Sequence, residues 1–153
     1  MMWHLISRLL RFLAAKPLLP REQLEVYDVL APQLRQLFFR QRHEDQRHAL
    51  AVKRWVEGVP ELYEAALLHD VGKTESDLGA VARAFATVWH GAGMQARSRW
   101  HSYINHGAIG ADLLEDRGAS ALAVAFTRHH PGPTPTGIRT DSWNALGEAD
   151  ERG

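Results

Sequence analysis

Leu67-Leu68-His69-Asp70-Val71-Gly72-Lys73 is the most informative segment of this chain. It places a histidine–aspartate pair at the end of an apolar run, where burying a charge is costly unless another group binds it. In a helix, Lys73 lies one turn after this pair, so the three side chains are neighbours. Because imidazole and carboxylate are both ligands of divalent cations, the stretch predicts a buried metal site. The alternative is a core histidine beside a capping or surface aspartate, with the lysine complementing the helix dipole.

The composition predicts one globular domain, residues 1–153, long enough to bury a core. Basic and acidic residues balance at 18 each, so the formal net charge is zero and no overall field recruits nucleic acid or membrane. We therefore expect no nucleic-acid partner. Cysteine is absent, which excludes disulfides and thiolate ligands and suits a cytoplasmic protein. Histidine, in contrast, occurs nine times.

The spacing of apolar residues predicts an all-α fold, since no run of alternating apolar and polar residues indicates a strand. Pro32 is expected to kink or divide the second helix, and Pro131 to end the seventh. Asn105 and Ser120 are predicted to cap the sixth and seventh helices, and Gly118 to close the sixth. The predicted helices cover residues 1–16, about 21–40, about 43–57, 60 to about 72, 76–90, 105–118, 120–130 and 141–150.

The first sixteen residues combine a broad apolar stripe with charges at helical intervals. Arg8 and Arg11 interrupt the apolar run, which stays short of the ~18–20 residues of a membrane span, so no transmembrane segment is expected. The charges also lie in the wrong places for a signal peptide. We expect a helix that packs onto the domain or onto a partner subunit, as in a homo-oligomer; the alternative is a helix on a membrane surface.

The order of histidines and aspartates along the chain resembles the HD-domain superfamily of metal-dependent phosphohydrolases. That signature is a histidine, a His-Asp doublet and a distant aspartate, all on helices. Members with two metals add two histidines before the last aspartate, as in the branch that includes the bacterial symmetrical diadenosine-tetraphosphate hydrolases. The match covers about residues 43–151. The matching residues are His48, His69, Asp70, His106, His130 and Asp150.

The resemblance implies a compact helical bundle, with residues 43–153 as the HD-domain core and residues 1–42 as an N-terminal helical extension. It also implies an enzyme that uses metal-activated water to hydrolyse a phosphoester or phosphoanhydride of a nucleotide or similar small substrate. Two divalent ions are expected, for which His/carboxylate ligands admit Mn, Fe, Co, Ni, Zn or Mg.

In that family arrangement one ion is held by two histidines and two aspartates, and the aspartate of the doublet bridges to the second ion. The resemblance therefore assigns the first ion to His48, His69, Asp70 and Asp150, and the second to Asp70, His106 and His130. Asp70 and Lys73 are assigned catalytic roles, with the lysine neutralising charge on phosphoryl oxygens.

The adjacent histidines His129 and His130 compete for one ligand position. A helix C-terminus favours a cationic imidazole, which explains one of the two without any metal. Alignment with the family favours His130 as the ligand and leaves His129 to contact the substrate. Arg97 and Arg99, in a basic segment, are further candidates for bidentate phosphate binding; the alternative is that both are solvated.

Gly107 and Gly110 permit the close helix approach that a crowded metal site needs. Two other functions are compatible with the sequence. The apolar N-terminal helices and the short last helix suit a non-enzymatic regulatory module that binds metal or nucleotide. The resemblance also admits a di-iron oxygenase on the same scaffold.

Overall fold

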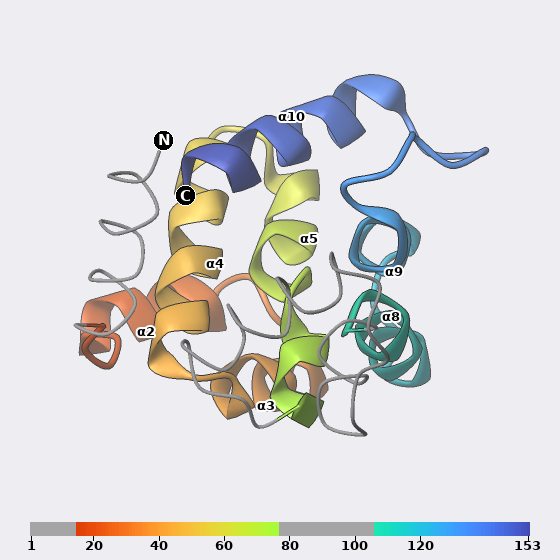
Figure 1. Ribbon diagram of the computed structural model, residues 1–153. Helices are drawn as coiled ribbons and strands as arrows, with labels where there is room; N and C mark the ends of the chain where they lie inside the picture. The colour runs from red at the N-terminus through yellow and green to blue at the C-terminus, as the bar shows by residue number, and fades with distance from the viewer. Residues whose placement is uncertain (1–14, 77–105) are drawn as a thin grey trace, which may run out of the picture.

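The computed structural model describes residues 15–76 and 106–153, which are helical and contain no strand (Figure 1). The all-α prediction is therefore confirmed for these residues. The helices predicted over residues 1–16 and 76–90 lie largely outside them, as do Arg97 and Arg99. The described elements are α2 (Pro20–Tyr27), α3 (Pro32–Arg40), α4 (His43–Trp55), η1 (Pro60–Leu62), α5 (Tyr63–Leu68), η2 (Val71–Ser76), α8 (His106–Asp116), α9 (Ala121–His129) and α10 (Thr140–Arg152), where η marks a 3₁₀-helix.

Pro32 divides the helix predicted over residues 21–40 into α2 and α3. Proline is well suited to the first turn of a helix, where its missing N–H would have no partner, and here it opens α3. Arg35 then secures the end of α2, donating from its guanidinium to the carbonyls of Leu30 (2.6 Å) and Tyr27 (2.8 Å). Arg35 on α3 thus links the two short helices.

The centre of the described fold is α5, whose residues Ala65 to Leu68 are completely buried. α4 and α9 pack against it, and Figure 1 shows α10 running across the ends of α4 and α5. Phe126 on α9 and Leu146 on α10 are also fully buried, so the four helices share one apolar core. None of the described helices is long and apolar enough to cross a membrane.

The helix predicted over residues 60–72 is broken into three pieces. A 3₁₀ turn precedes α5, and α5 stops at Leu68, so that His69 caps its end. The chain then tightens into η2, where the N–H of Lys73 bonds to the carbonyl of Asp70 at 3.0 Å, the i to i+3 spacing of a 3₁₀-helix. The His-Asp doublet therefore lies at a junction between two helices rather than inside one.

Two of the predicted signals for α8 and α9 can be compared with the structure, whereas Asn105, the predicted cap of α8, lies outside the described residues. Gly118, at φ +68°, follows the end of α8, and the hydroxyl of Ser120 accepts from the N–H of Ala123 at 3.3 Å to cap α9. α10 begins at Thr140, slightly earlier than predicted, and runs to Arg152. Asp150 is therefore inside the helix and not at its end.

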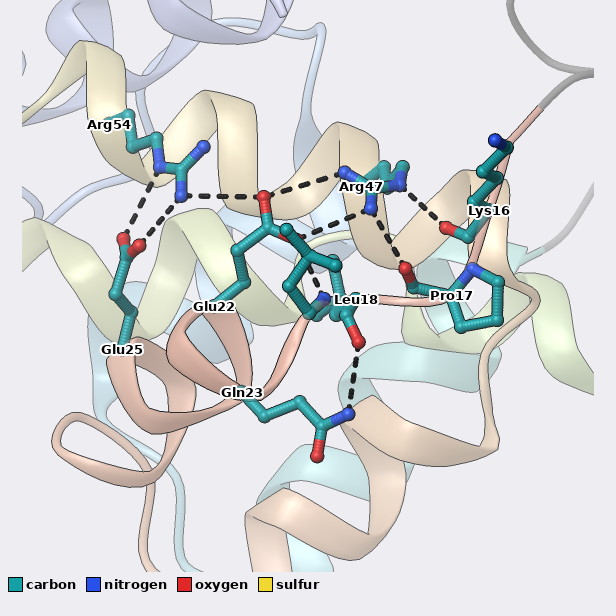
Figure 2. Close-up of polar contacts among 9 residues, drawn as sticks. Lys16, Pro17, Leu18, Glu22, Gln23, Glu25, Arg47 and Arg54 are labelled. Carbon is teal, nitrogen blue, oxygen red and sulfur yellow. Dashed lines mark hydrogen bonds and ion pairs between the residues drawn. The ribbon is translucent and has the colours of Figure 1, made fainter.

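The segment that leads into α2 is fastened to α4 by Arg47 (Figure 2). Its guanidinium donates to the carbonyls of Lys16 (2.5 Å) and Pro17 (2.8 Å) and to the carboxylate of Glu22 (3.2 Å). Glu22 also accepts from the N–H of Leu19 at 2.8 Å. The Leu19 N–H, followed by Arg47, holds the pKa of the Glu22 carboxyl below its ordinary value despite burial.

Candidate metal centre

One carboxylate, that of Asp150, is in contact with three imidazoles from three different parts of the fold. Its Oδ1 lies 2.9 Å from Nε2 of His48 on α4 and 3.1 Å from Nε2 of His69 at the end of α5. Its Oδ2 lies 3.0 Å from Nε2 of His130, which follows α9. The ligand atoms of His48, His69 and Asp150 lie within 4.8 Å of one another, so a single cation could contact all three.

His69 is oriented by the backbone of its own helix. Its Nδ1 donates to the carbonyl of Ala66 at 2.9 Å, which leaves the lone pair on Nε2. Among the described residues that buried Nε2 has no hydrogen-bond partner, although Asp150 lies near it. A buried polar atom without a partner is rare, and an imidazole held by a backbone carbonyl is the usual arrangement of a metal ligand. The residues present therefore fit a divalent cation.

Asp70 connects this group to a second set of side chains. Its Oδ2 lies 3.5 Å from Nε2 of His69 and forms an ion pair with the ammonium of Lys73. Its Oδ1 lies 3.6 Å from Nε2 of His106, the first residue of α8. Asp70 is buried, so its charge is compensated by these cationic or polar neighbours and not by bulk water.

The charges of the site are strongly coupled. Burial opposes the ionised form of Asp70, but Lys73, His69 and His106 outweigh it and hold the pKa of this carboxyl well below its ordinary value. Burial likewise opposes ionisation of Asp150, whose pKa the imidazoles of His130, His48 and His69 nevertheless lower. The centre therefore presents two anionic carboxylates to any ion that enters it.

Two glycines allow α8 to approach η2 closely enough for His106 to reach Asp70. A Cβ at Gly72 would lie 1.9 Å from the carbonyl oxygen of His106, and a Cβ at Gly110 would lie 2.9 Å from the backbone N of Gly72. Gly107 similarly faces the carbonyl of Thr127 on α9, at 2.8 Å from such a Cβ. The close helix approach predicted from Gly107 and Gly110 is confirmed.

The structure brings together all six residues of the signature, His48, His69, Asp70, His106, His130 and Asp150. His130, and not the exposed His129, points to the cluster. Two aromatic residues that sequence reasoning missed lie beside it, Phe126 and Trp143. Phe126 precedes His130 by one helical turn, a spacing visible in the sequence that could have identified it.

The described fold is all-helical and gathers histidines and aspartates from several helices, as the resemblance to HD domains implied, and comparison with known families agrees. The family model for the Cas3 HD domain matches residues 31–151. The chain belongs to this HD-domain family, whose members bind divalent metals and act as metal-dependent hydrolases. No curated protein and no solved structure matches the chain significantly.

Proposed function

We propose that this chain is a phosphohydrolase that cleaves a phosphoester or phosphoanhydride of a nucleotide or similar small phosphorylated substrate. The observation that carries the proposal is the buried Nε2 of His69, which has no hydrogen-bond partner in the described part of the chain and faces the carboxylates of Asp70 and Asp150. Such an atom is stabilised if a cation lies between it and the carboxylates.

We propose two ion sites that share Asp70. One lies on the side of His69, and the other lies on the side of His106. The contacts of Asp70 support its role as the shared ligand, because one oxygen faces His69 and the other faces His106. His130 joins the cluster through Oδ2 of Asp150. The first ion is proposed to bind His48, His69, Asp70 and Asp150, and the second Asp70, His106 and His130.

A divalent ion bound here supplies Lewis-acid polarisation of a phosphoryl oxygen and lowers the pKa of a water molecule. The chain itself supplies orientation and charge. We propose that Lys73, one turn after Asp70 and paired with it, neutralises the non-bridging oxygens of a phosphate. We propose His129 as a substrate contact because it is exposed directly beside His130, and Arg97 and Arg99 as further phosphate contacts.

The test is a hydrolysis screen on the full chain, stripped of metal and reloaded with manganese. We expect phosphate release from at least one nucleotide, and we expect His69→Ala and Asp70→Ala each to reduce the rate by about 100-fold or more. His43→Ala is the matched control, because His43 is an exposed histidine on α4 and should leave the rate unchanged. Bound metal without hydrolysis of any substrate would instead indicate a regulatory module.

A second candidate function is cleavage of nucleic acid, and the family match favours it, since Cas3 HD domains act on nucleic acids. The formal net charge of zero favours a nucleotide or similar small substrate, because the chain has no overall positive field to attract a nucleic acid. The same screen separates the two by including single-stranded and duplex oligonucleotides. A nuclease would shorten the oligonucleotides and lose activity steeply with added salt, whereas a nucleotide hydrolase would leave them intact.

A further inference from the structure

The imidazole of His130 is held differently from that of His69. Within the described residues its ring has one hydrogen-bond contact, from Nε2 to Asp150, and no backbone carbonyl fixes its other nitrogen. The ring lies instead on the fully buried ring of Phe126, with centroids 4.4 Å apart and planes 23° apart. The terminal torsion of a histidine is broad, so a stacked neighbour decides which way Nε2 points.

Trp143 on α10 fixes that arrangement from the other side. Its indole ring meets the ring of Phe126 edge to face, with centroids 5.1 Å apart. Its Nε1 donates at 3.1 Å to the carbonyl of Gly132, two residues after His130. Trp143 therefore contacts both the stacking ring and the loop that follows the histidine.

Phe126 also lies near a second imidazole of the site. Phe126 lies edge-on to His69 at a centroid distance of 6.2 Å. The backbone of α10 also closes on His130, since a Cβ at Gly147 would lie 3.5 Å from its Cε1. Trp143, Gly147 and Asp150 all belong to α10, so the helix that carries the carboxylate also confines the imidazole.

We propose that Phe126 and Trp143 are positioning residues, which set the orientation of the His130 ring so that Nε2 points into the candidate metal centre, where it lies 3.0 Å from Asp150. This inference rests on the proposed function, because it assumes that His130 is a ligand. A ring already held in its bound orientation loses no rotational freedom when the ion binds, and this raises the affinity of the site.

The test compares two leucine substitutions, Phe126→Leu and Phe38→Leu, in the full chain. Both phenylalanines are completely buried, but the ring contact of Phe38 is with Phe39 and not with an imidazole. Both variants should lose thermal stability. Titration with manganese should show an affinity about tenfold weaker for Phe126→Leu, by analogy with other residues that orient metal ligands, and unchanged for Phe38→Leu. Equal affinities in the two variants would overturn the proposal.

A milder variant covers the case in which Phe126→Leu does not fold. Trp143→Phe keeps an aromatic ring but removes the donor to Gly132, and its manganese affinity should be lower than that of the wild type. An affinity equal to that of the wild type would exclude Trp143 from the positioning role. Without metal, the His130 Cε1 proton should show an upfield ring-current shift by NMR, which Phe126→Leu abolishes; its absence from the wild type would contradict the stacking.

These readouts separate the positioning role from the proposed reaction. A wild type that binds manganese but releases no phosphate would contradict the hydrolase and leave the comparison of affinities valid. A wild type that hydrolyses phosphate, with no difference between the two leucine variants, would contradict only the positioning role. A wild type with no manganese affinity would overturn both.

Discussion

At the scale of single residues, Asp150 holds the candidate centre together. Its two oxygens contact imidazoles from α4, from the end of α5 and from the end of α9. The side chain is only 23% exposed, so these three rings, and not bulk water, are its main polar neighbours. Removing the charge leaves the imidazoles without their common partner.

Asp150→Asn should therefore weaken metal binding strongly while keeping the shape of the side chain. We expect at least a tenfold loss of manganese affinity, measured by elemental analysis after dialysis and by titration. Glu148→Gln is the control, because this exposed carboxylate lies on the same helix and pairs with Arg152. Similar metal content in both variants would exclude Asp150 as a ligand.

The sequence predicted which residues gather at the candidate site better than it predicted the contacts that orient them. The six signature positions could be selected because their order along the chain is specific, although each alone is ambiguous. The sequence could not give the contact between Nδ1 of His69 and the carbonyl of Ala66, since that depends on where α5 ends. The stacking of Phe126 on His130 depends in turn on how α9 turns toward α10.

At the scale of elements, the crossing of η2 and α8 sets the separation of Asp70 from His106. The two backbones are in contact at Gly72 and Gly110, where neither element has room for a side chain. The prediction of one continuous helix over residues 60–72 did not anticipate this crossing, because apolar spacing does not reveal where a helix changes to a 3₁₀ turn. The 3₁₀ segment η2 that follows the break is the part of the chain that packs against α8.

Gly72→Ala should separate η2 from α8, because its Cβ would overlap the carbonyl of His106. We expect a loss of unfolding free energy of about 1–3 kcal/mol, from the midpoint of urea denaturation, together with reduced metal affinity. Gly147→Ala is the contrasting change, since its Cβ meets only an ordinary contact and alanine favours a helix interior by about 0.5–1 kcal/mol. If Gly72→Ala and Gly147→Ala had equal unfolding free energies, the backbones of η2 and α8 would be able to move apart at little cost.

At the scale of the whole molecule, charged contacts fasten the first described segment to the core. Glu22 accepts from Leu19 and Arg47, and Arg54 donates to Glu25 at 2.6 Å (Figure 2). The pKa of Glu22 lies below its ordinary value of 4.5. Its ionised form therefore stabilises the fold fully above that pH, and this contribution is lost as the pH falls through the lower pKa of the folded state.

Glu22→Gln should accordingly flatten the dependence of stability on pH below about 4.5. The unfolding free energy of both proteins would be followed by denaturant titration between neutral and acid pH. Gln23→Ala removes a neighbouring hydrogen bond to Leu18 that does not titrate, so its effect should be the same at every pH. A curve for Glu22→Gln parallel to that of the wild type would contradict the role of Glu22.

Metal should also stabilise the entire fold, because an ion that binds only the folded chain shifts the unfolding equilibrium. At a free manganese concentration 100 times the Kd, the expected gain is about 2.7 kcal/mol. The melting temperature should rise with manganese and return to its starting value with a chelator. Asp150→Asn should show little of this response, and an equal response in that variant would place the ion elsewhere.

The contact between His48 and Asp150 joins positions 102 residues apart in the sequence. During synthesis the ribosome therefore releases every imidazole of the cluster before the carboxylate that gathers them. The centre cannot assemble on a growing chain until α10 has been translated and has docked. Any reactivity that this centre confers is thereby withheld from nascent chains in which α10 has not yet emerged and docked.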